Sequence, residues 1–174
     1  KKRGRCVGLV ITAGGKWNPR FFAGKRVFVT GHNGFKGSWL SWTLLELGAD
    51  VTGFARAPDP NGLFQITGLD REISCIEGDV ADYDVLSAAL GSSKPDIVFH
   101  LAAQALVLPS YADPIATFQA NVVGTIHVLE ALRYVPSVQA ALIISSDKCY
   151  RNHGVVTSKT GFGEDDPLGG RDPY

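Results

Sequence analysis

Short runs of β-branched and aromatic residues alternate along this chain with stretches whose apolar positions recur every three or four residues. The short runs are mostly apolar, as strands are when helices cover both faces of their sheet. They are Arg26–Thr30, Asp50–Ala55, Ile73–Ile76, Asp96–Leu101 and Val138–Ser145. Strands that alternate with helices are typical of βαβ units. The pattern therefore predicts an α/β fold with a doubly wound parallel sheet and helices on both faces.

Two stretches show a clear helical period. Phe35–Leu47 carries apolar residues along one face and stops at Gly48. Pro114–Val135 is longer, with Asp113 as a suitable N-cap and proline at the first helical position, where no backbone donor is needed. Its periodic apolar positions are Ile115, Phe118, Val122, Ile126 and Leu129. Both stretches are predicted to be helices.

The two ends of the chain lack such patterns. Residues 1–20 show no sustained period, and we expect a tail or a cloning remnant there, followed by one domain over residues 21–174. The stretch from Tyr150 to Pro173 is rich in Gly, Asp and Pro, which predicts a long loop of the kind that carries function. The chain contains no methionine, so we expect that it does not begin at a natural initiator.

Composition narrows the class of protein. The chain has 174 residues, of which 45% are hydrophobic and 20% charged, enough for one sizeable core. No apolar run approaches the ~20 residues that cross a bilayer, and no signal-peptide pattern opens the chain. We therefore expect a soluble cytoplasmic protein without a membrane partner.

Metal and nucleic-acid chemistry are disfavoured by the same composition. The three cysteines and four histidines are scattered, without metal-ligand spacing, so we expect no metal and no disulfide framework. Four of the seventeen basic residues lie in the first five positions, a run we interpret as a solvated tail. The remainder has an excess of acidic groups, which argues against a nucleic-acid partner.

A glycine-rich turn follows the first predicted strand and leads into the first helix. Glycines at positions 31, 34 and 37 allow a tight turn and a close approach of the backbone to a pyrophosphate, which a helix N-terminus attracts. This context favours a Rossmann-type dinucleotide site over a purely structural turn. The cofactor-binding residues predicted here are Gly31, Asn33, Gly34, Phe35, Lys36 and Gly37.

Three further positions suit the same cofactor. Arg56, at the end of the second strand, is either the partner of a 2′-phosphate, which leaves NADP open, or an exposed loop residue. Asp79 and Val80 follow the third strand, where a carboxylate can accept a hydrogen bond from an adenine amino group. At the end of the fourth strand, small residues let the backbone approach a cofactor. This third group comprises Leu101, Ala102, Ala103 and Gln104. The alternatives for the last two groups are a turn aspartate and close helix packing.

Reactive side chains follow the fifth predicted strand. Residues 145–150 place a hydroxyl, a carboxylate and an amine in sequence, namely Ser146, Asp147 and Lys148. Because ligands of open parallel sheets bind beyond the carboxyl ends of the strands, this cluster should face the same crevice as the glycine turn. Its chemistry fits an acid/base set, although a turn with a helix cap is the structural alternative.

These motifs resemble a known group of enzymes. The glycine turn, His100–Gln104 (HLAAQ), Asn121–Thr125 (NVVGT) and the Ser-Asp-Lys cluster are similar to the extended short-chain dehydrogenase/reductase superfamily. Three longer stretches resemble the CDP-glucose 4,6-dehydratase family within it. They are Phe28–Leu40 (FVTGHNGFKGSWL), Ser146–Tyr150 (SDKCY) and Asp166–Tyr174 (DPLGGRDPY). The resemblance departs from the usual pattern at Asn33, where threonine is expected, and at Leu108, where arginine is expected.

The resemblance implies an activity, a cofactor and a set of roles. It implies an NAD-dependent lyase that converts CDP-glucose to CDP-4-keto-6-deoxyglucose by oxidation at C4, elimination of water across C5 and C6, and return of hydride to C6. Tyr174 would be the base at the 4-hydroxyl, and Ser146 would hold the 4-oxygen. Asp147 would protonate the departing C6 hydroxyl, with Lys148 as its partner.

The resemblance further implies a longer protein. Residues 21–174 would form an incomplete NAD-binding domain, with the substrate-binding part and the lysine of Tyr-x-x-x-Lys absent, so we expect these residues alone to be inactive. The complete protein would be a homodimer. Two other functions stay open: a sugar-nucleotide epimerase, which needs no elimination pair such as Asp147 and Lys148, and a non-catalytic nucleotide-binding module.

Overall fold

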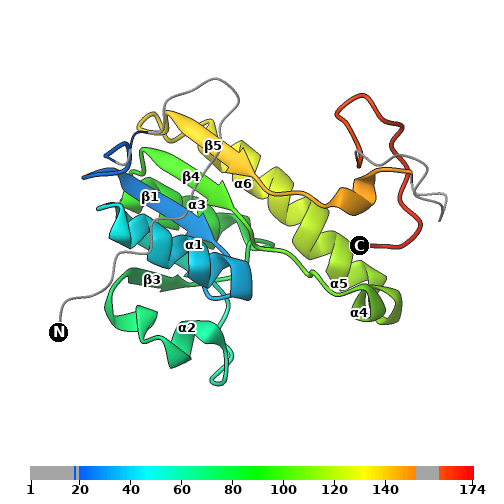
Figure 1. Cartoon of the computed structure of the whole chain (residues 1–174), viewed down its shortest axis with the longest axis horizontal. Coiled ribbons are helices and arrows are strands. Elements are labelled where there is room, and N and C mark those ends of the chain that lie inside the picture. Colours follow the sequence, from blue (N-terminus) through cyan, green and yellow to red (C-terminus); the bar gives the residue numbers. More distant parts are fainter. Residues whose placement is uncertain (1–17, 19, 152–160) are drawn as a thin grey trace.

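A single parallel sheet forms the centre of the molecule (Figure 1). The structure, a computed structural model, describes residue 18, residues 20–151 and residues 161–174. The sheet has the order β3-β2-β1-β4-β5, and all four pairings are parallel. Its strands are β1 (Arg26–Thr30), β2 (Asp50–Ala55), β3 (Ser74–Glu77), β4 (Ile97–His100) and β5 (Ala140–Ile143). The predicted parallel α/β fold is confirmed.

Helices connect successive strands. They are α1 (Phe35–Glu46), α2 (Leu63–Ile66), α3 (Tyr83–Ser93), α4 (Val107–Ala112), α5 (Pro114–Phe118) and α6 (Gly124–Leu132), with short 3₁₀ turns η1 (Leu69–Arg71) and η3 (Asp147–Cys149). The predicted helix from Pro114 is present, and the Asp113 carboxylate caps it by accepting a 2.9 Å hydrogen bond from the Ala116 amide. Apolar periodicity did not predict the π-helical turn η2 (Gln119–Val123), which interrupts this helix.

Alternate residues of the central strands enter two separate cores. Val27 and Val29 of β1 point to one side of the sheet and pack with Leu44 of α1. Phe28, between them, points to the opposite side and packs with a core that includes Leu90 of α3 and Val128 of α6. All these side chains are at most 1% exposed. The period of two along β1 therefore places α1 on one face and α3 with α6 on the other (Figure 1).

Three strands differ from the prediction, either in their bounds or in how well they are covered. All three strands β3, β4 and β5 begin one or two residues later than predicted, and β3 and β5 are largely exposed. Leu142 of β5 keeps 51% of its surface accessible. A strand at the edge of a sheet has one unpaired side and fewer neighbouring helices, which accounts for this exposure.

The last described segment folds back on the turn that follows β5. The Arg151 amide donates to the Pro167 carbonyl at 2.8 Å, and the Gly169 amide donates to the Cys149 carbonyl at the same distance. Figure 1 shows this segment, coloured red, returning toward α4 and α5. The predicted loop after Tyr150 is irregular where it is described. The predicted tail over residues 1–17 lies outside the described residues.

The helical stretch Pro114–Leu132 carries an exposed apolar face. With 19 residues and a mean hydropathy of 1.2, it is long and apolar enough by composition to cross a membrane, and 22% of it is buried. One such helix is weak evidence for a membrane span, because the core helix of a soluble protein meets the same criterion of length and composition. Its exposed apolar residues are Ile115, Phe118, Val122, Val123, Ile126 and Leu129.

Candidate cofactor and catalytic site

The glycine turn between β1 and α1 has three glycines with different roles. Gly31 adopts φ +70°, and a Cβ there would lie 2.7 Å from the Ala102 amide nitrogen. A Cβ on Gly37 would overlap the Gly31 carbonyl oxygen. Both positions therefore require glycine for the fold itself.

Gly34 is different because the space above it is open. Its φ of −71° suits any residue, and a Cβ there would meet only the Gly31 carbonyl oxygen, at 3.4 Å. Gly34 is also the N-cap of the twelve-residue helix α1, and no side chain caps this end. The first amides of α1 are therefore available to another acceptor, and the turn fits the pyrophosphate of a dinucleotide.

The end of β2 is tied to this turn. The Asn33 side-chain amide donates a 2.7 Å hydrogen bond to the Arg56 carbonyl oxygen. The Arg56 side chain is exposed. The structure thus brings Arg56 next to the glycine turn, and Asn33, where the resembling family has threonine, makes the connection.

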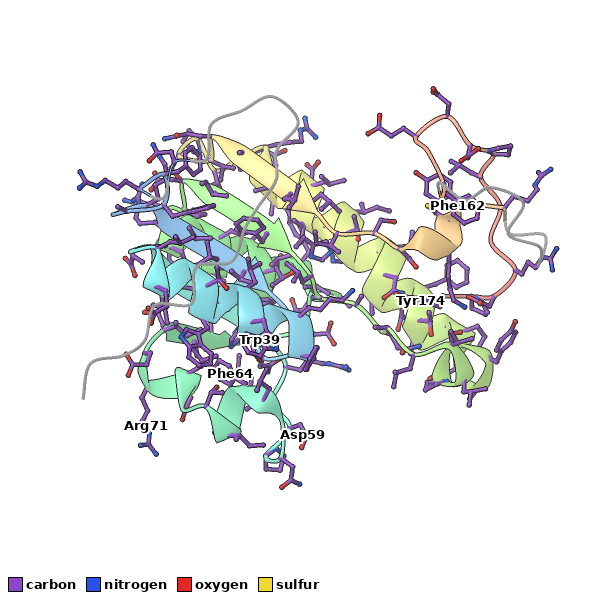
Figure 2. All side chains as sticks on the ribbon, in the orientation of Figure 1. Trp39, Asp59, Phe64, Arg71, Phe162 and Tyr174 are labelled. Atoms are coloured by element: carbon purple, nitrogen blue, oxygen red, sulfur yellow. The ribbon has the colours of Figure 1, made fainter. Side chains whose placement is uncertain are left out.

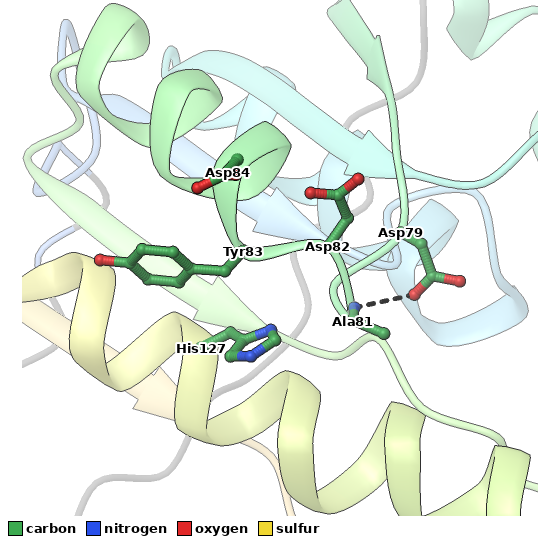
Figure 3. Close-up of a pocket in the computed structure, with 6 residues that line it drawn as sticks. All are labelled: Asp79, Ala81, Asp82, Tyr83, Asp84 and His127. Carbon is green, nitrogen blue, oxygen red and sulfur yellow. Dashed lines mark hydrogen bonds between the residues drawn. The ribbon is translucent and has the colours of Figure 1, made fainter.

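The turn after β3 packs against α6 (Figure 3). One Asp79 carboxylate oxygen accepts a 2.9 Å hydrogen bond from the Ala81 amide, and Figure 3 shows this side chain pointing away from His127. The His127 ring, whose Nδ1 lies 3.0 Å from the Val80 carbonyl oxygen, holds this turn to α6. A Cβ on Gly124 would lie 2.6 Å from Val80, so glycine permits the close packing.

A shallow depression of about 520 Å³ lies beside this turn, on the α3 and α6 side. Its lining residues are Asp79, Ala81, Asp82, Tyr83, Asp84 and His127. Of the predicted cofactor residues it includes Asp79 alone. No residue of the glycine turn lines this depression.

The loop after β4 is held at both ends. At its start, the Leu101 and Ala102 amides each donate a 3.1 Å hydrogen bond to the Thr30 hydroxyl oxygen. At its end, the Gln104 amide donates to the Asn121 side-chain oxygen at 2.7 Å, and the Asn121 amide group donates to the Gln104 carbonyl at 3.1 Å. The start of the predicted segment 101–104, at Leu101 and Ala102, thus lies directly against Gly31 of the glycine turn.

Two buried histidines lie near these loops. His32, within the glycine turn, is 3% exposed, and His100, at the end of β4, is 2% exposed. Burial lowers the pKa of each ring to about 4. Both are therefore neutral at physiological pH, and neither adds positive charge to an anion site.

The reactive cluster after β5 is organised by an ion pair. The Lys148 ammonium lies 2.6 Å from an Asp172 carboxylate oxygen, and 5.8 Å from the centre of the Tyr174 ring. The hydrogen bond to Asp172 raises the pKa of Lys148, so this amine is charged. The Ser146 hydroxyl oxygen accepts a 3.2 Å hydrogen bond from the Lys148 amide. The side chain of Asp147 lies outside the described part of the structure.

Helix α4 contributes to the same cluster. The Tyr111 hydroxyl donates a 3.3 Å hydrogen bond to the Arg171 carbonyl oxygen, next to Asp172. In the view of Figure 2, Tyr174 lies near the helical region that Figure 1 labels α4 and α5. Neither Tyr111 nor Asp172 was predicted as a site residue. A lysine and an aspartate 24 positions apart in different loops show no periodicity that could connect them.

The predicted residues fall into two groups. The cofactor group follows the carboxyl ends of β1 to β4, and the catalytic group follows β5, so all lie beyond the same edge of the sheet. Between the described residues of the two groups, no hydrogen bond or ion pair is formed. The structure brings together Lys148, Asp172 and Tyr174, and separately the glycine turn, Arg56 and the loop 101–104.

A five-stranded parallel sheet of this order, with a glycine turn after β1, defines a Rossmann-type fold. Residues 28–174 match the sequence model of the family described as GDP-mannose 4,6 dehydratase. The chain belongs to this family, whose members include sugar-nucleotide 4,6-dehydratases.

Individual relatives agree with this assignment. A CDP-glucose 4,6-dehydratase from Salmonella typhimurium is 49% identical over 158 residues, which are 90% of this chain and 43% of that protein. Two solved structures are similar. WbmG from Bordetella bronchiseptica, in complex with NAD and UDP, has a TM-score of 0.72 at 26% identity, over 87% of this chain and 46% of that one. A UDP-glucose 4-epimerase from Brucella ovis, in complex with NAD, has a TM-score of 0.71 at 28% identity, over 86% and 43%. The chain thus spans less than half the length of these relatives.

Proposed function

We propose that the protein containing this chain is an NAD-dependent CDP-glucose 4,6-dehydratase that forms CDP-4-keto-6-deoxyglucose. The observation that carries the proposal is the cluster after β5, in which Lys148 lies between Asp172 and the ring of Tyr174. An epimerase needs a tyrosine and a serine, but an elimination also needs groups that protonate a leaving hydroxyl and stabilise charge. The sequence Ser146-Asp147-Lys148 supplies them next to Tyr174.

The cofactor would be held by the loops at the carboxyl edge of the sheet. The open space above Gly34 and the uncapped N-terminus of α1 support a pyrophosphate there. Arg56, Asp79, Val80 and residues 101–104 surround the same edge. Bound NAD supplies a hydride acceptor for sugar C4 and later a hydride donor for C6. Tighter binding of NADP than of NAD by the complete protein would contradict this assignment.

The residues of the chain would then move the protons. Tyr174, as its phenolate, takes the proton of the 4-hydroxyl, and the Ser146 hydroxyl holds the 4-oxygen. Asp147 gives a proton to the C6 hydroxyl, which leaves as water. Because Lys148 is charged and paired with Asp172, its ammonium suits the stabilisation of the negative charge that develops when the C5 proton is removed. The C5 proton itself passes to a base supplied by the rest of the complete protein.

The organisation of the complete protein follows from the same proposal. Residues 21–174 form part of its NAD-binding domain, and the part that binds the sugar nucleotide lies outside this chain. The exposed apolar face on α5, η2 and α6 forms a contact between two copies. Burial of this face in a homodimer accounts for apolar side chains that the described residues leave 37% to 72% exposed.

The test uses the complete protein with NAD and CDP-glucose. We expect a 4-keto-6-deoxy product, detected by mass spectrometry as loss of water, with GDP-mannose, UDP-glucose and dTDP-glucose turned over much more slowly. Formation of a 4-epimer of unchanged mass would instead assign an epimerase. Binding of NAD without turnover of any of the four substrates would assign a non-catalytic module.

A further inference from the structure

The buried ring of His100 lies in the middle of a hydrogen-bond chain that crosses the fold. Its Nδ1 is 2.7 Å from the Thr30 hydroxyl oxygen, and its Nε2 is 3.1 Å from the Thr125 hydroxyl oxygen. Thr30 and His100 are register partners at the last positions of β1 and β4. Thr125 lies on α6, one turn after Asn121. The chain therefore joins two strands to the helix that packs behind them.

The direction of each hydrogen bond follows from the groups at the two ends. The Thr30 oxygen accepts from two backbone amides, Leu101 and Ala102, and amides can only donate. The Leu101 amide is shared with the Thr30 carbonyl oxygen, also at 3.1 Å. Among the described residues, His100 Nδ1 is the only acceptor within hydrogen-bond distance of the Thr30 hydroxyl, so the hydroxyl proton goes to His100. A neutral ring that accepts at Nδ1 carries its proton on Nε2. This proton is donated to Thr125, whose own hydroxyl donates to the Asn121 carbonyl at 2.6 Å.

A charged ring does not fit this arrangement. A proton on Nδ1 would turn this nitrogen into a donor, and the Thr30 hydroxyl proton would lose its acceptor. Thr30 is completely buried, so water could not replace the lost bond. Burial lowers the pKa of His100 to about 4, which agrees with a neutral ring at physiological pH.

The two ends of this hydrogen-bond chain hold the two ends of one loop. Thr30 accepts from Leu101 and Ala102 at the start of the loop, and the Asn121 side chain bonds both the amide and the carbonyl of Gln104 at its end. Asn121 lies in the π-helical turn η2, and its carbonyl accepts from Thr125. The loop packs against Gly31, where a Cβ would lie 2.7 Å from the Ala102 nitrogen. The position of one wall of the crevice at the glycine turn therefore depends on these hydrogen bonds.

We infer that Thr30, His100 and Thr125 are positioning residues for the cofactor, acting through a one-directional hydrogen-bond chain with the His100 proton on Nε2. The inference rests on the proposed function, because it assumes that residues 101–104 contact a dinucleotide. The three residues do not touch the cofactor themselves. They fix the loop backbone that does, and so determine the affinity for NAD.

The first experiment needs no cofactor. Nitrogen-15 NMR of the 174-residue chain at pH 7.5 reads the protonation of His100, assigned by comparison with His100→Asn. We expect a neutral ring with the proton on Nε2 and none on Nδ1. A proton on Nδ1 would contradict the direction of the bond from Thr30 to His100 and overturn the inference.

The second experiment compares variants at Thr30 by calorimetric titration with NAD, at a temperature where circular dichroism shows all of them folded. Thr30→Val keeps the shape of the side chain and removes the hydroxyl, and we expect it to weaken NAD binding by about tenfold or more. Thr30→Ser retains the hydroxyl and should bind within about threefold of the wild type. Thr52→Val, on the neighbouring strand β2 and outside the chain of bonds, is the matched control and should leave binding unchanged.

The outcomes separate the two proposals. If the wild type binds NAD and folded Thr30→Val binds it equally strongly, the positioning role is overturned and the proposed function is left intact. Absence of NAD binding by both the wild-type chain and the complete protein overturns the proposed function, and the positioning role with it. Loss in Thr30→Val that Thr30→Ser does not restore also contradicts the inference, because the hydroxyl would then not be the group that matters.

Discussion

At the scale of single residues, neighbouring glycines in one turn have different tasks. Gly31 and Gly37 have no room for a Cβ, whereas Gly34 has room and an ordinary backbone conformation. A substitution at Gly34 therefore separates cofactor binding from folding, which substitutions at the other two cannot do. In the reactive cluster, Asp172 has no role of its own in the proposed chemistry, but its hydrogen bond raises the pKa of Lys148 further and holds the ammonium in place.

We expect Gly34→Val to leave the unfolding temperature nearly unchanged and to weaken NAD binding by about tenfold or more, or about 1.4 kcal/mol. The branched side chain would occupy the open space above the turn and block the approach of a pyrophosphate. Thermal unfolding and calorimetric titration measure the two effects. Gly91→Val, at an exposed helical glycine with nothing within 4 Å of its Cβ, is the control and should bind NAD normally. Unchanged NAD affinity in Gly34→Val would remove the pyrophosphate from this turn.

We expect Asp147→Asn in the complete protein to slow dehydration more than the initial oxidation at C4. Only the elimination needs the proton that Asp147 is proposed to give, and one general acid typically contributes ~10²- to 10⁴-fold. Single-turnover absorbance of the reduced cofactor measures the first step, and product formation measures the second. Equal loss in both steps would reduce Asp147 to a structural role.

At the scale of elements, one ion pair joins the starts of β1 and β4. The Asp96 carboxylate accepts three hydrogen bonds from Arg26, two from the guanidinium and one from the backbone amide, at 2.9 to 3.3 Å. These bonds with the Arg26 side chain and amide lower the pKa of Asp96 to about 2. The two strands are adjacent at the centre of the sheet, so the pair contributes to the alignment of the strands whose other ends carry the cofactor loops.

This pair predicts a specific dependence of stability on pH. The pKa of Asp96 is about 2 in the folded state and ~3.9 in an unfolded chain. A lowered carboxyl pKa stabilises the fold above the unfolded value, and this contribution is lost as the pH falls from about 4 to about 2. We expect Asp96→Asn to unfold at lower urea concentration than the wild type at pH 7, with the difference shrinking toward pH 2. Glu72→Gln, at an exposed site, should show no such trend. A difference between Asp96→Asn and the wild type that stays constant from pH 7 to pH 2 would contradict the assignment.

At the scale of the whole molecule, the main feature is an apolar face on the longest helical stretch. The six apolar side chains of this face are between 37% and 72% exposed. A water-soluble protein rarely leaves such a contiguous face uncovered. The proposed dimer buries it and places two cofactor sites in one assembly.

We expect Ile126→Glu in the complete protein to shift the sedimentation of a dimer to that of a monomer, because a carboxylate would be buried in an apolar contact. Ile126 is 55% exposed in the chain alone, so the fold itself should tolerate the change. Ile66→Glu, at a residue 73% exposed on α2, is the matched control and should remain dimeric. A wild-type protein that sediments as a monomer at micromolar concentration would exclude the dimer.

Much of the fold follows from local patterns in the sequence. Apolar runs located β1 and β2 to the residue, because central strands are buried on both faces and their ends coincide with a change in polarity. The glycine turn was recognised for a similar reason, since tight backbone geometry admits few residue types. The edge strands were predicted less well, because their exposure depends on which elements lie beyond them.

Tertiary structure alone decided the contacts between distant residues. Lys148 meets Asp172, and His100 meets both Thr30 and Thr125, across separations that no periodic pattern encodes. The sequence determined that polar groups would gather at the carboxyl edge of the sheet, because parallel strands all end there. Which of these groups are paired, and which proton each buried group donates, depends on distances that only the packing of strands against helices sets.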